Sequence, residues 1–283
     1  MTVSAPARSA ARKARPAPLP SALRVGMSRA GIELKAFFRE KQAVAFVLTL
    51  PAIMLILLGS IFRNSGAGHG LSVGELFAAG LIGGGIMSTS YQNLGMSIAI
   101  ERDRGMLKRL RGTPMPGAGY FIGKTCLVLV TTVAEMVILI IVGMLVDHLH
   151  LPDSAARWWT FAWVFVLGTV ACTLLGIAAS SVPRSARSAT AVITLPFVVL
   201  QFISGVYVPF TLVPPWLGDI AAIFPLKWIC QGLRSVFLPA QAASLEPAGS
   251  WEHGRTALVL AAWVVAGLVL CVTTFRWQRR QDR

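Results

Sequence analysis

The sequence predicts an all-α, polytopic membrane protein with six transmembrane helices. Of its 283 residues, 55% are hydrophobic and only 13% are charged, and the mean hydropathy is +0.66. A soluble domain of this length is less apolar. The apolar residues gather in runs of about 20, the length that crosses a bilayer as a helix. The net charge of +14 comes from basic residues beside these runs, so we expect a lipid bilayer, and no nucleic acid, as the partner.

The chain begins with a basic arm, residues 1–21, that is rich in Ala, Pro and Arg. This arm has no large apolar cluster to offset the entropy of ordering, so we expect it to be disordered. Apolar residues then recur at three- and four-residue steps through residues 22–41, which predicts an amphipathic helix in the headgroup plane. The apolar positions of this helix are Leu23, Met27, Ala30, Leu34, Phe37 and Phe38.

Six apolar runs are long enough to span the membrane. We place the spans near residues 43–62, 76–99, 121–146, 158–182, 188–208 and 256–275. Between the fifth and sixth spans, prolines cut residues 209–240 into short apolar pieces. This pattern predicts small re-entrant or interfacial helices on the outer side of the membrane.

The Lys and Arg side chains predict the orientation, because basic residues concentrate in cytoplasmic loops. Most of the 26 fall on one side, in the N-terminal arm and helix, in residues 100–112, in the loop of Arg184 and Arg187, and in the C-terminal tail. Both termini are therefore expected in the cytoplasm. Lys124, just inside the third span, is expected to snorkel to the same side. The other side carries Arg63, Arg157, Lys227, Arg234 and Arg255.

The sequence does not favour a catalytic or metal site. Its four cysteines form no CxxC, and we interpret them as small core residues. The GKT at residues 123–125 lacks the earlier glycine of a phosphate-binding loop, so we expect no ATP site in this chain. DHLHLPD at residues 147–153 is interpreted as a solvated loop and not as metal ligands. No predicted span contains a histidine and there is no HExxH, which argues against a haem-binding redox subunit and a metalloprotease.

Several polar residues lie within the predicted spans. Glu135 is deep in the third span, where an ionised carboxylate costs about 3 kcal/mol, so it should face protein or a water-filled path. A substrate path and a structural hydrogen bond both remain open for it. Polar residues of the second and fifth spans either hold helices together or line the same path. The candidate path residues are Ser88, Tyr91, Gln92, Glu135, Gln201 and Ser204.

The polar stretch ERDRGMLKRLRGTP, residues 101–114, lies between the second and third spans. It predicts a short amphipathic helix over residues 100–112, ended by Gly112, Thr113 and Pro114. Met106, Leu107 and Leu110 share one face of this helix. The opposite face carries Glu101, Arg104, Lys108 and Arg111.

Two segments carry a resemblance to a known family. ERDRGMLKRLRGTPM resembles the signature of ABC-2 type transporter permeases, and SGVYVPFTLVPPWLGDIAAIFPLKWICQGLR resembles that family's segment after the fifth span. The resemblance covers residues 22–276, within a predicted transmembrane domain of residues 22–283, and is nearest to the drug-resistance permeases typified by daunorubicin exporters. Asp103, Met106 and Phe224 depart from the usual pattern.

The resemblance implies a permease subunit of an ABC exporter in a bacterial inner membrane. It implies that residues 100–112 are a coupling helix that docks into a cytoplasmic ATPase. Two such ATPase subunits would hold ATP and Mg²⁺, and a second permease subunit, identical or different, would complete the path. The coupling residues would be Glu101, Arg102, Arg104, Gly105, Met106, Leu107, Leu110, Arg111 and Pro114.

The cargo expected from the apolar composition is an amphipathic or lipophilic drug or lipid, and export of such a drug would give antibiotic resistance. One alternative is the export of a lipid-linked polysaccharide, which other members of the resembled family perform. A membrane-embedded enzyme or redox subunit is the alternative from another class. Catalysis by the isolated chain would favour it.

Overall fold

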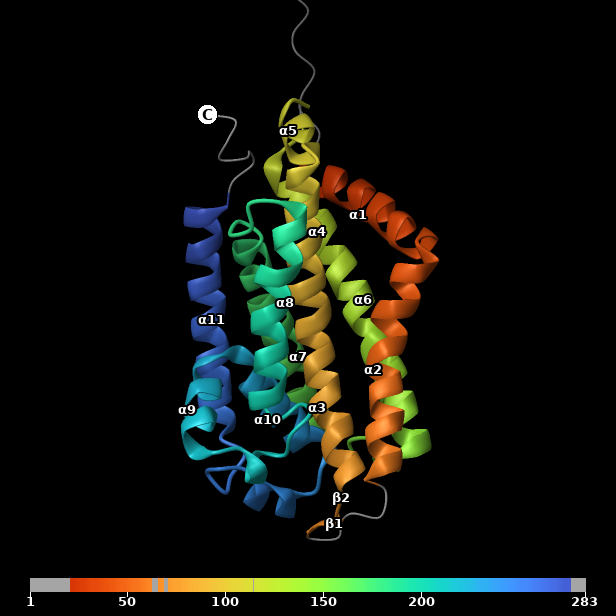
Figure 1. Cartoon of the computed structure of the whole chain (residues 1–283), viewed down its shortest axis with the longest axis vertical. Helices are drawn as coiled ribbons and strands as arrows, with labels where there is room; N and C mark the ends of the chain where they lie inside the picture. Colours follow the sequence, from red (N-terminus) through yellow and green to blue (C-terminus); the bar gives the residue numbers. More distant parts are fainter. Residues whose placement is uncertain (1–20, 63–65, 69–70, 114, 276–283) are drawn as a thin grey trace, which may run out of the picture.

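The described residues, 21–62, 66–68, 71–113 and 115–275, form a bundle of long helices with one short hairpin in a computed structural model (Figure 1). Among these residues, five helices are long and apolar enough to cross a membrane. They are α2 (Lys41–Ile61), α6 (Gly117–Val146), α7 (Ala155–Ala179), α8 (Ala186–Ile203) and α11 (His253–Thr274). The predicted spans 43–62, 121–146, 158–182, 188–208 and 256–275 are thus helical, with boundaries that differ by a few residues.

The second predicted span, 76–99, is divided into three elements. It comprises α3 (Val73–Met87), a π-helical turn η1 (Ser88–Asn93) and α4 (Leu94–Asp103). The Thr89 hydroxyl contacts the Gly85 carbonyl oxygen at 3.1 Å and the Thr132 hydroxyl of α6 at 2.5 Å. A side-chain bond to a helix carbonyl competes with the regular backbone pattern, which is a common origin of such irregular turns.

Helix α1 (Ala22–Arg39) slants across one end of the bundle, against the start of α6 (Figure 1). Small residues make this contact, because a Cβ on Gly26 would lie 2.6 Å from the Ile122 side chain. Of the predicted apolar face, Ala30 is buried, whereas Leu23 and Met27 are 66% and 56% exposed. The helix therefore buries its small residues in the protein and leaves larger apolar side chains at the surface.

The opposite end of the bundle carries the short elements. These are β1 (Gly66–Gly68), β2 (Leu71–Ser72), η2 (Phe210–Leu212), α9 (Pro215–Ile223), α10 (Pro225–Phe237) and η3 (Ala240–Leu245). The segment 209–240 thus forms small helices, as predicted. Helix α10, however, is buried along its whole length between α3 and α7. A Cβ on Gly83 of α3 would meet the Cys230 sulfur at 2.8 Å, so α10 packs in the protein core and not on its surface.

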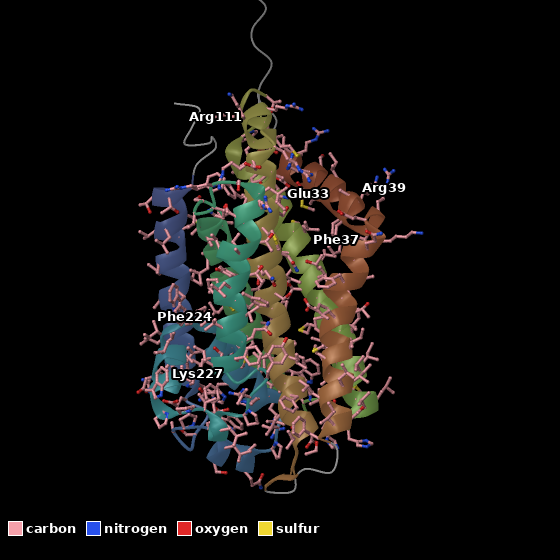
Figure 2. The ribbon with its side chains drawn as sticks, viewed as in Figure 1. Glu33, Phe37, Arg39, Arg111, Phe224 and Lys227 are labelled. Carbon is pink, nitrogen blue, oxygen red and sulfur yellow. The ribbon has the colours of Figure 1, made fainter. Side chains whose placement is uncertain are left out.

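The two ends of the bundle differ in character. Helix α5 (Met106–Arg111), α1 and the last turn of α11 lie at one end, named here the α5 end, and α9 and the hairpin lie at the other, the α9 end (Figure 1). Figure 2 shows Arg39 and Arg111 at the α5 end and Phe224 and Lys227 towards the α9 end. The main apolar core lies between α3, α7 and α10, and a second cluster lies below α5.

Candidate functional site

A sharp turn separates α4 from α5. Gly105 has a φ of +72°, a left-handed conformation that costs a residue with a Cβ about 1–2 kcal/mol. The turn ends α4 at Asp103 and starts α5 at Met106. The predicted single helix over residues 100–112 is therefore wrong, because the chain forms two helices that meet at Gly105.

The buried side of α5 differs from the predicted docking face. Leu107 is fully buried, in a cluster with Leu94, Ile98 and Tyr120, and Leu110 packs against the same cluster. Met106 is 43% exposed. Leu107 therefore anchors α5 to its own bundle, and in this conformation it is not accessible to a partner.

The exposed tip of α5 is basic. Besides Met106, its exposed side chains are those of Arg104, Lys108, Arg109 and Arg111. Arg102, at the end of α4, instead donates from Nη2 to the Pro183 carbonyl oxygen at 2.7 Å, in the loop between α7 and α8. Pro114, the last of the predicted coupling residues, lies outside the described residues.

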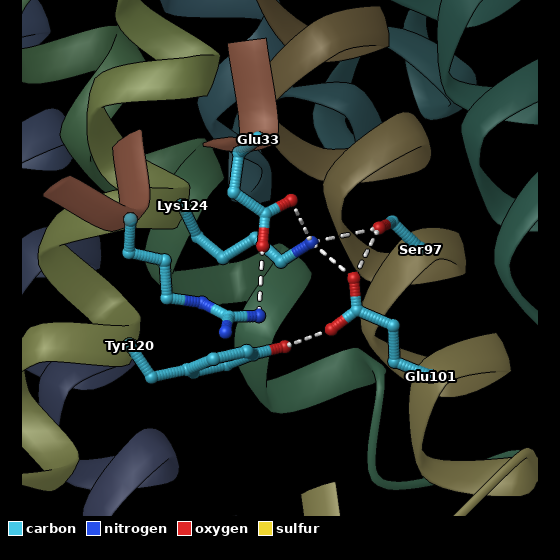
Figure 3. Close-up of polar contacts among 6 residues, drawn as sticks. Glu33, Ser97, Glu101, Tyr120 and Lys124 are labelled. Carbon is cyan, nitrogen blue, oxygen red and sulfur yellow. Dashed lines mark hydrogen bonds and ion pairs between the residues drawn. The ribbon is translucent and has the colours of Figure 1, made fainter. Parts of the chain in front are cut away.

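A network of charged and polar side chains joins α1, α4 and α6 (Figure 3). Lys124 of α6 is 1% exposed. Its Nζ donates to Glu33 Oε2 of α1 at 2.9 Å, to Ser97 Oγ of α4 at 3.1 Å, and to Glu101 Oε1 of α4. The prediction that Lys124 snorkels to the membrane surface is wrong, because the carboxylates meet it inside the protein.

Two further groups complete the network. Arg29 of α1 bonds the second oxygen of Glu33 at 2.9 Å, and Tyr120 donates to Glu101 Oε2 at 2.9 Å. The Arg29 guanidinium also lies 5.1 Å from the centre of the Tyr120 ring, within the range of a cation–π contact. Glu101 was predicted on the polar face opposite Leu107, but it points inward to Lys124. We name Arg29, Glu33, Ser97, Glu101, Tyr120 and Lys124 the charged network.

Sequence reasoning missed this network because its members are far apart along the chain. Glu33 and Lys124 come from different helices, and nothing in either segment alone indicates the pairing. One signal was present: the predicted topology placed Glu33, Glu101 and Lys124 at the same membrane side. Opposite charges at the ends of neighbouring spans are expected to pair, because an unpaired buried charge is costly.

A cavity of about 430 Å³ adjoins the charged network. It extends from Glu33 and Glu101 to the π-helical turn, and polar side chains line much of it. The lining includes Glu40, Thr89, Asn93, Ser97, Arg104, Met106 and Thr131. The six predicted path residues do not line this cavity.

Three of the predicted path residues, Glu135, Gln201 and Gln92, contact other helices. Glu135 is 1% exposed and packs on Gly85 of α3, and Gln201 packs on the preceding residue, Gly84. Neither oxygen of Glu135 has a hydrogen-bond partner among the described residues. In the π-helical turn, Gln92 donates to Thr194 of α8 at 3.1 Å.

The remaining path residues have mixed surroundings. Ser88 and Tyr91 are half-buried in the π-helical turn. Ser204, at the end of α8, is fully buried, and its hydroxyl has no partner within the described part of the chain. Within that part, no three His, Cys, Asp or Glu side chains gather as metal ligands.

The family model and the relatives that match this chain all belong to transport proteins. Residues 30–238 match the family model described as ABC-2 type transporter. The chain is 27% identical over 198 residues to a putative transport permease ycf38 of Porphyra purpurea, covering 66% of this chain and 65% of that protein. It is 24% identical over 232 residues to the inner membrane transport permease YadH of Escherichia coli K12, covering 80% of this chain and 83% of YadH. The match to the ycf38 protein thus covers less than two thirds of that relative.

Proposed function

Because the chain belongs to the ABC-2 type transporter family, we propose that it is the membrane subunit of an ABC exporter. A separate ATPase subunit, in two copies, binds ATP and Mg²⁺ and drives transport, and this chain has no catalytic site. Its six spans are the five long helices and the α3–η1–α4 segment, with α1 as an interfacial helix. The α5 end faces the cytoplasm of a bacterial cell, and the α9 end faces outward.

The exposed tip of α5 is the observation that carries this proposal. It projects from the bundle (Figure 1) and exposes Met106 together with the basic side chains of Arg104, Arg109 and Arg111. An exposed apolar side chain close in sequence to several exposed basic ones suits an acidic groove on a partner, because charges set the orientation and the association rate while the apolar anchor supplies affinity. We therefore place the ATPase contact on these side chains and not on Leu107.

The charged network transmits movement of this tip. A displacement of α4 moves Glu101, which bonds Lys124 of α6, and Lys124 in turn bonds Glu33 of α1. Arg102 connects the same helix to the loop after α7. Closure of the two ATPase subunits would then shift α1, α4 and α6 together, in the manner of a rigid-body switch.

The cargo is an amphipathic or lipophilic molecule, such as a drug or a lipid. Large apolar residues on the outside of the bundle, among them Leu57, Leu195 and Val272, suit contact with lipid and with a second permease subunit. Glu135 and Gln201, which pack on adjacent glycines of α3, are polar groups of the transport path.

A charge-reversal experiment tests the ATPase contact. The chain is co-expressed with the ABC ATPase subunit proposed as its partner, and the amount of ATPase that co-purifies is measured. Met106→Glu combined with Arg109→Glu should reduce the recovered ATPase by at least about tenfold, since each removes part of an interface anchor. Arg157→Glu, a matched reversal at the α9 end, should leave it unchanged. Equal recovery with all variants would exclude α5 as the contact.

A further inference from the structure

A second cavity lies at the α9 end, far from α5. Its volume is about 240 Å³, room for several water molecules or a small organic group. The start of α3, the turn after α8 and the segments around η2 and η3 enclose it, and most of its lining is apolar. The apolar lining includes Val73, Leu76, Phe77, Phe210, Leu212 and Leu245.

A buried ion pair supplies the charged groups of this cavity. Arg234 of α10 and Glu246, which follows η3, both line it and are 4% and 6% exposed. Arg234 Nε donates to Glu246 Oε1 at 2.5 Å, and Nη1 donates to the Gly205 carbonyl oxygen at 3.2 Å. Burial acts to lower the pKa of Arg234, but the adjacent Glu246 raises it above its ordinary value. A guanidinium paired with a carboxylate adds no net charge to the cavity.

The turn at Gly205 shapes the cavity. Its φ is +80°, and a Cβ there would lie 2.6 Å from the Phe210 ring and 3.0 Å from Arg234 Nη1. The Phe210 ring in turn lies 5.3 Å from the guanidinium, which orients the arginine by a cation–π contact. The guanidinium is thus fixed in position by a carboxylate, a carbonyl and an aromatic ring.

This pair is not fully satisfied. Arg234 Nη2 and Glu246 Oε2 are buried, and neither has a hydrogen-bond partner among the described residues. A buried donor or acceptor of a charged group normally finds a partner, because leaving it unpaired is costly. One donor and one acceptor, on side chains already in contact, therefore remain to be satisfied in a largely apolar cavity.

We propose that this cavity binds an amphipathic molecule through an uncharged hydroxyl or primary amide group. That group accepts a hydrogen bond from Arg234 Nη2 and donates one to Glu246 Oε2, while the apolar part of the molecule packs on Phe77, Phe210 and Leu245. A cationic or anionic head fits less well. The ion pair has no net charge to offset a third one, and a buried charge without a counter-charge is unfavourable.

The role of this site rests on the proposed function. In an exporter with the α9 end outside, the cavity is where cargo lies before release, and the cargo class is then neutral and hydroxyl- or amide-bearing. Binding itself requires neither an ATPase nor transport. It can therefore be tested on the chain alone, and a negative result there would leave the ATPase contact of α5 unaffected.

The test uses protection of an introduced cysteine. The full chain carrying Leu212→Cys, at the exposed rim of the cavity, is placed in lipid nanodiscs and labelled with a water-soluble maleimide. The probes are hexanol, hexanamide, hexylamine and hexanoate, which share a tail and differ in the head. Trp216→Cys on α9, exposed but outside the cavity lining, is the matched control and corrects for probe dissolved in the bilayer.

Hexanol and hexanamide should protect Leu212→Cys at concentrations about tenfold lower than hexylamine and hexanoate, as expected when a charge-assisted hydrogen bond is gained without burying a net charge. Two variants that each remove one charge of the ion pair should change this order. Glu246→Gln leaves Arg234 as an uncompensated cation and should make hexanoate the best probe. Arg234→Gln leaves Glu246 as an uncompensated anion and should favour hexylamine.

Three results would overturn the proposal. Equal protection by all four probes would mean dissolution in the bilayer only, and no protection by any of them would mean that the cavity holds water only. An unchanged order of probes in variants that keep the labelling rate of Trp216→Cys would exclude the ion pair as the recognition element. If either variant fails to fold, the four-probe comparison in the parent chain decides.

Discussion

Lys124 shows how a single residue can join three helices. It is charged and almost fully buried, yet it lies in an apolar span and bonds Glu33 and Glu101 from two other helices. Sequence reasoning identified it only as a basic residue at a span end, because its partners are remote in the chain. The same reasoning did identify Glu135 as a buried carboxylate, because the residues before and after it in the same helix are apolar and predict its burial.

We expect Lys124→Met to destabilise the chain by about 3–5 kcal/mol, since it leaves the carboxylate of Glu101 buried without its cation. Lys35→Met, at an exposed position of α1, should change stability by less than about 0.5 kcal/mol. The readout is the temperature at which the buried thiols of Cys172 and Cys230 become reactive in detergent. Adding Glu101→Gln to Lys124→Met should restore part of the loss. If the thiols become reactive at the same temperature in Lys124→Met and in Lys35→Met, the network contributes nothing to stability.

At the scale of elements, the long helices could be predicted and the irregular ones could not. The apolar runs fixed α2, α6, α7 and α11 to within a few residues, because span length follows from bilayer thickness. The π-helical turn also carries the contact between Thr89 and Thr132 of α6, and no local sequence pattern indicates that two such distant residues meet. The burial of α10 could not be predicted either. Arg234 suggests a polar face for this helix, and only the structure shows that Glu246 pairs with it.

Gly105 gives a prediction about the α4–α5 element, and Gly31 in α1 is its matched control. A Cβ at either glycine would meet nothing within 4 Å, and only Gly105 has a positive φ. Gly105→Ala should therefore cost about 1–2 kcal/mol, whereas Gly31→Ala should stabilise its helix by about 1 kcal/mol. Thermal melting in detergent measures both. A decrease in the melting temperature of Gly31→Ala, or an unchanged melting temperature of Gly105→Ala, would contradict this explanation of the turn.

Gly105→Ala should also affect assembly with the ATPase. A strained residue 105 changes the direction in which α5 leaves α4, so Gly105→Ala should also lower the amount of co-purified ATPase, and Gly31→Ala should not.

The whole molecule combines an apolar surface with an uneven charge distribution. Leu195 and Val272 are 68% and 80% exposed, an arrangement that is stable where lipid or another subunit covers them. The exposed basic residues of α5 and those of α1 lie at one end, as Figure 2 shows for Arg39 and Arg111. Composition and charge were sufficient to predict this global arrangement, because both are sums over many residues. The cavities were not predictable, since each depends on a few contacts.

The charge distribution predicts the orientation in the membrane. Basic segments are retained in the cytoplasm, so Arg109→Cys, on the tip of α5, should be protected from an impermeant maleimide in intact cells and labelled only after permeabilisation. Leu212→Cys, at the α9 end, should be labelled in intact cells. The parent chain is the background control, because its Cys172 and Cys230 are buried and its Cys126 and Cys271 are partly buried in the long helices. Labelling of Arg109→Cys in intact cells would reverse the orientation, and α5 could then not reach a cytoplasmic ATPase.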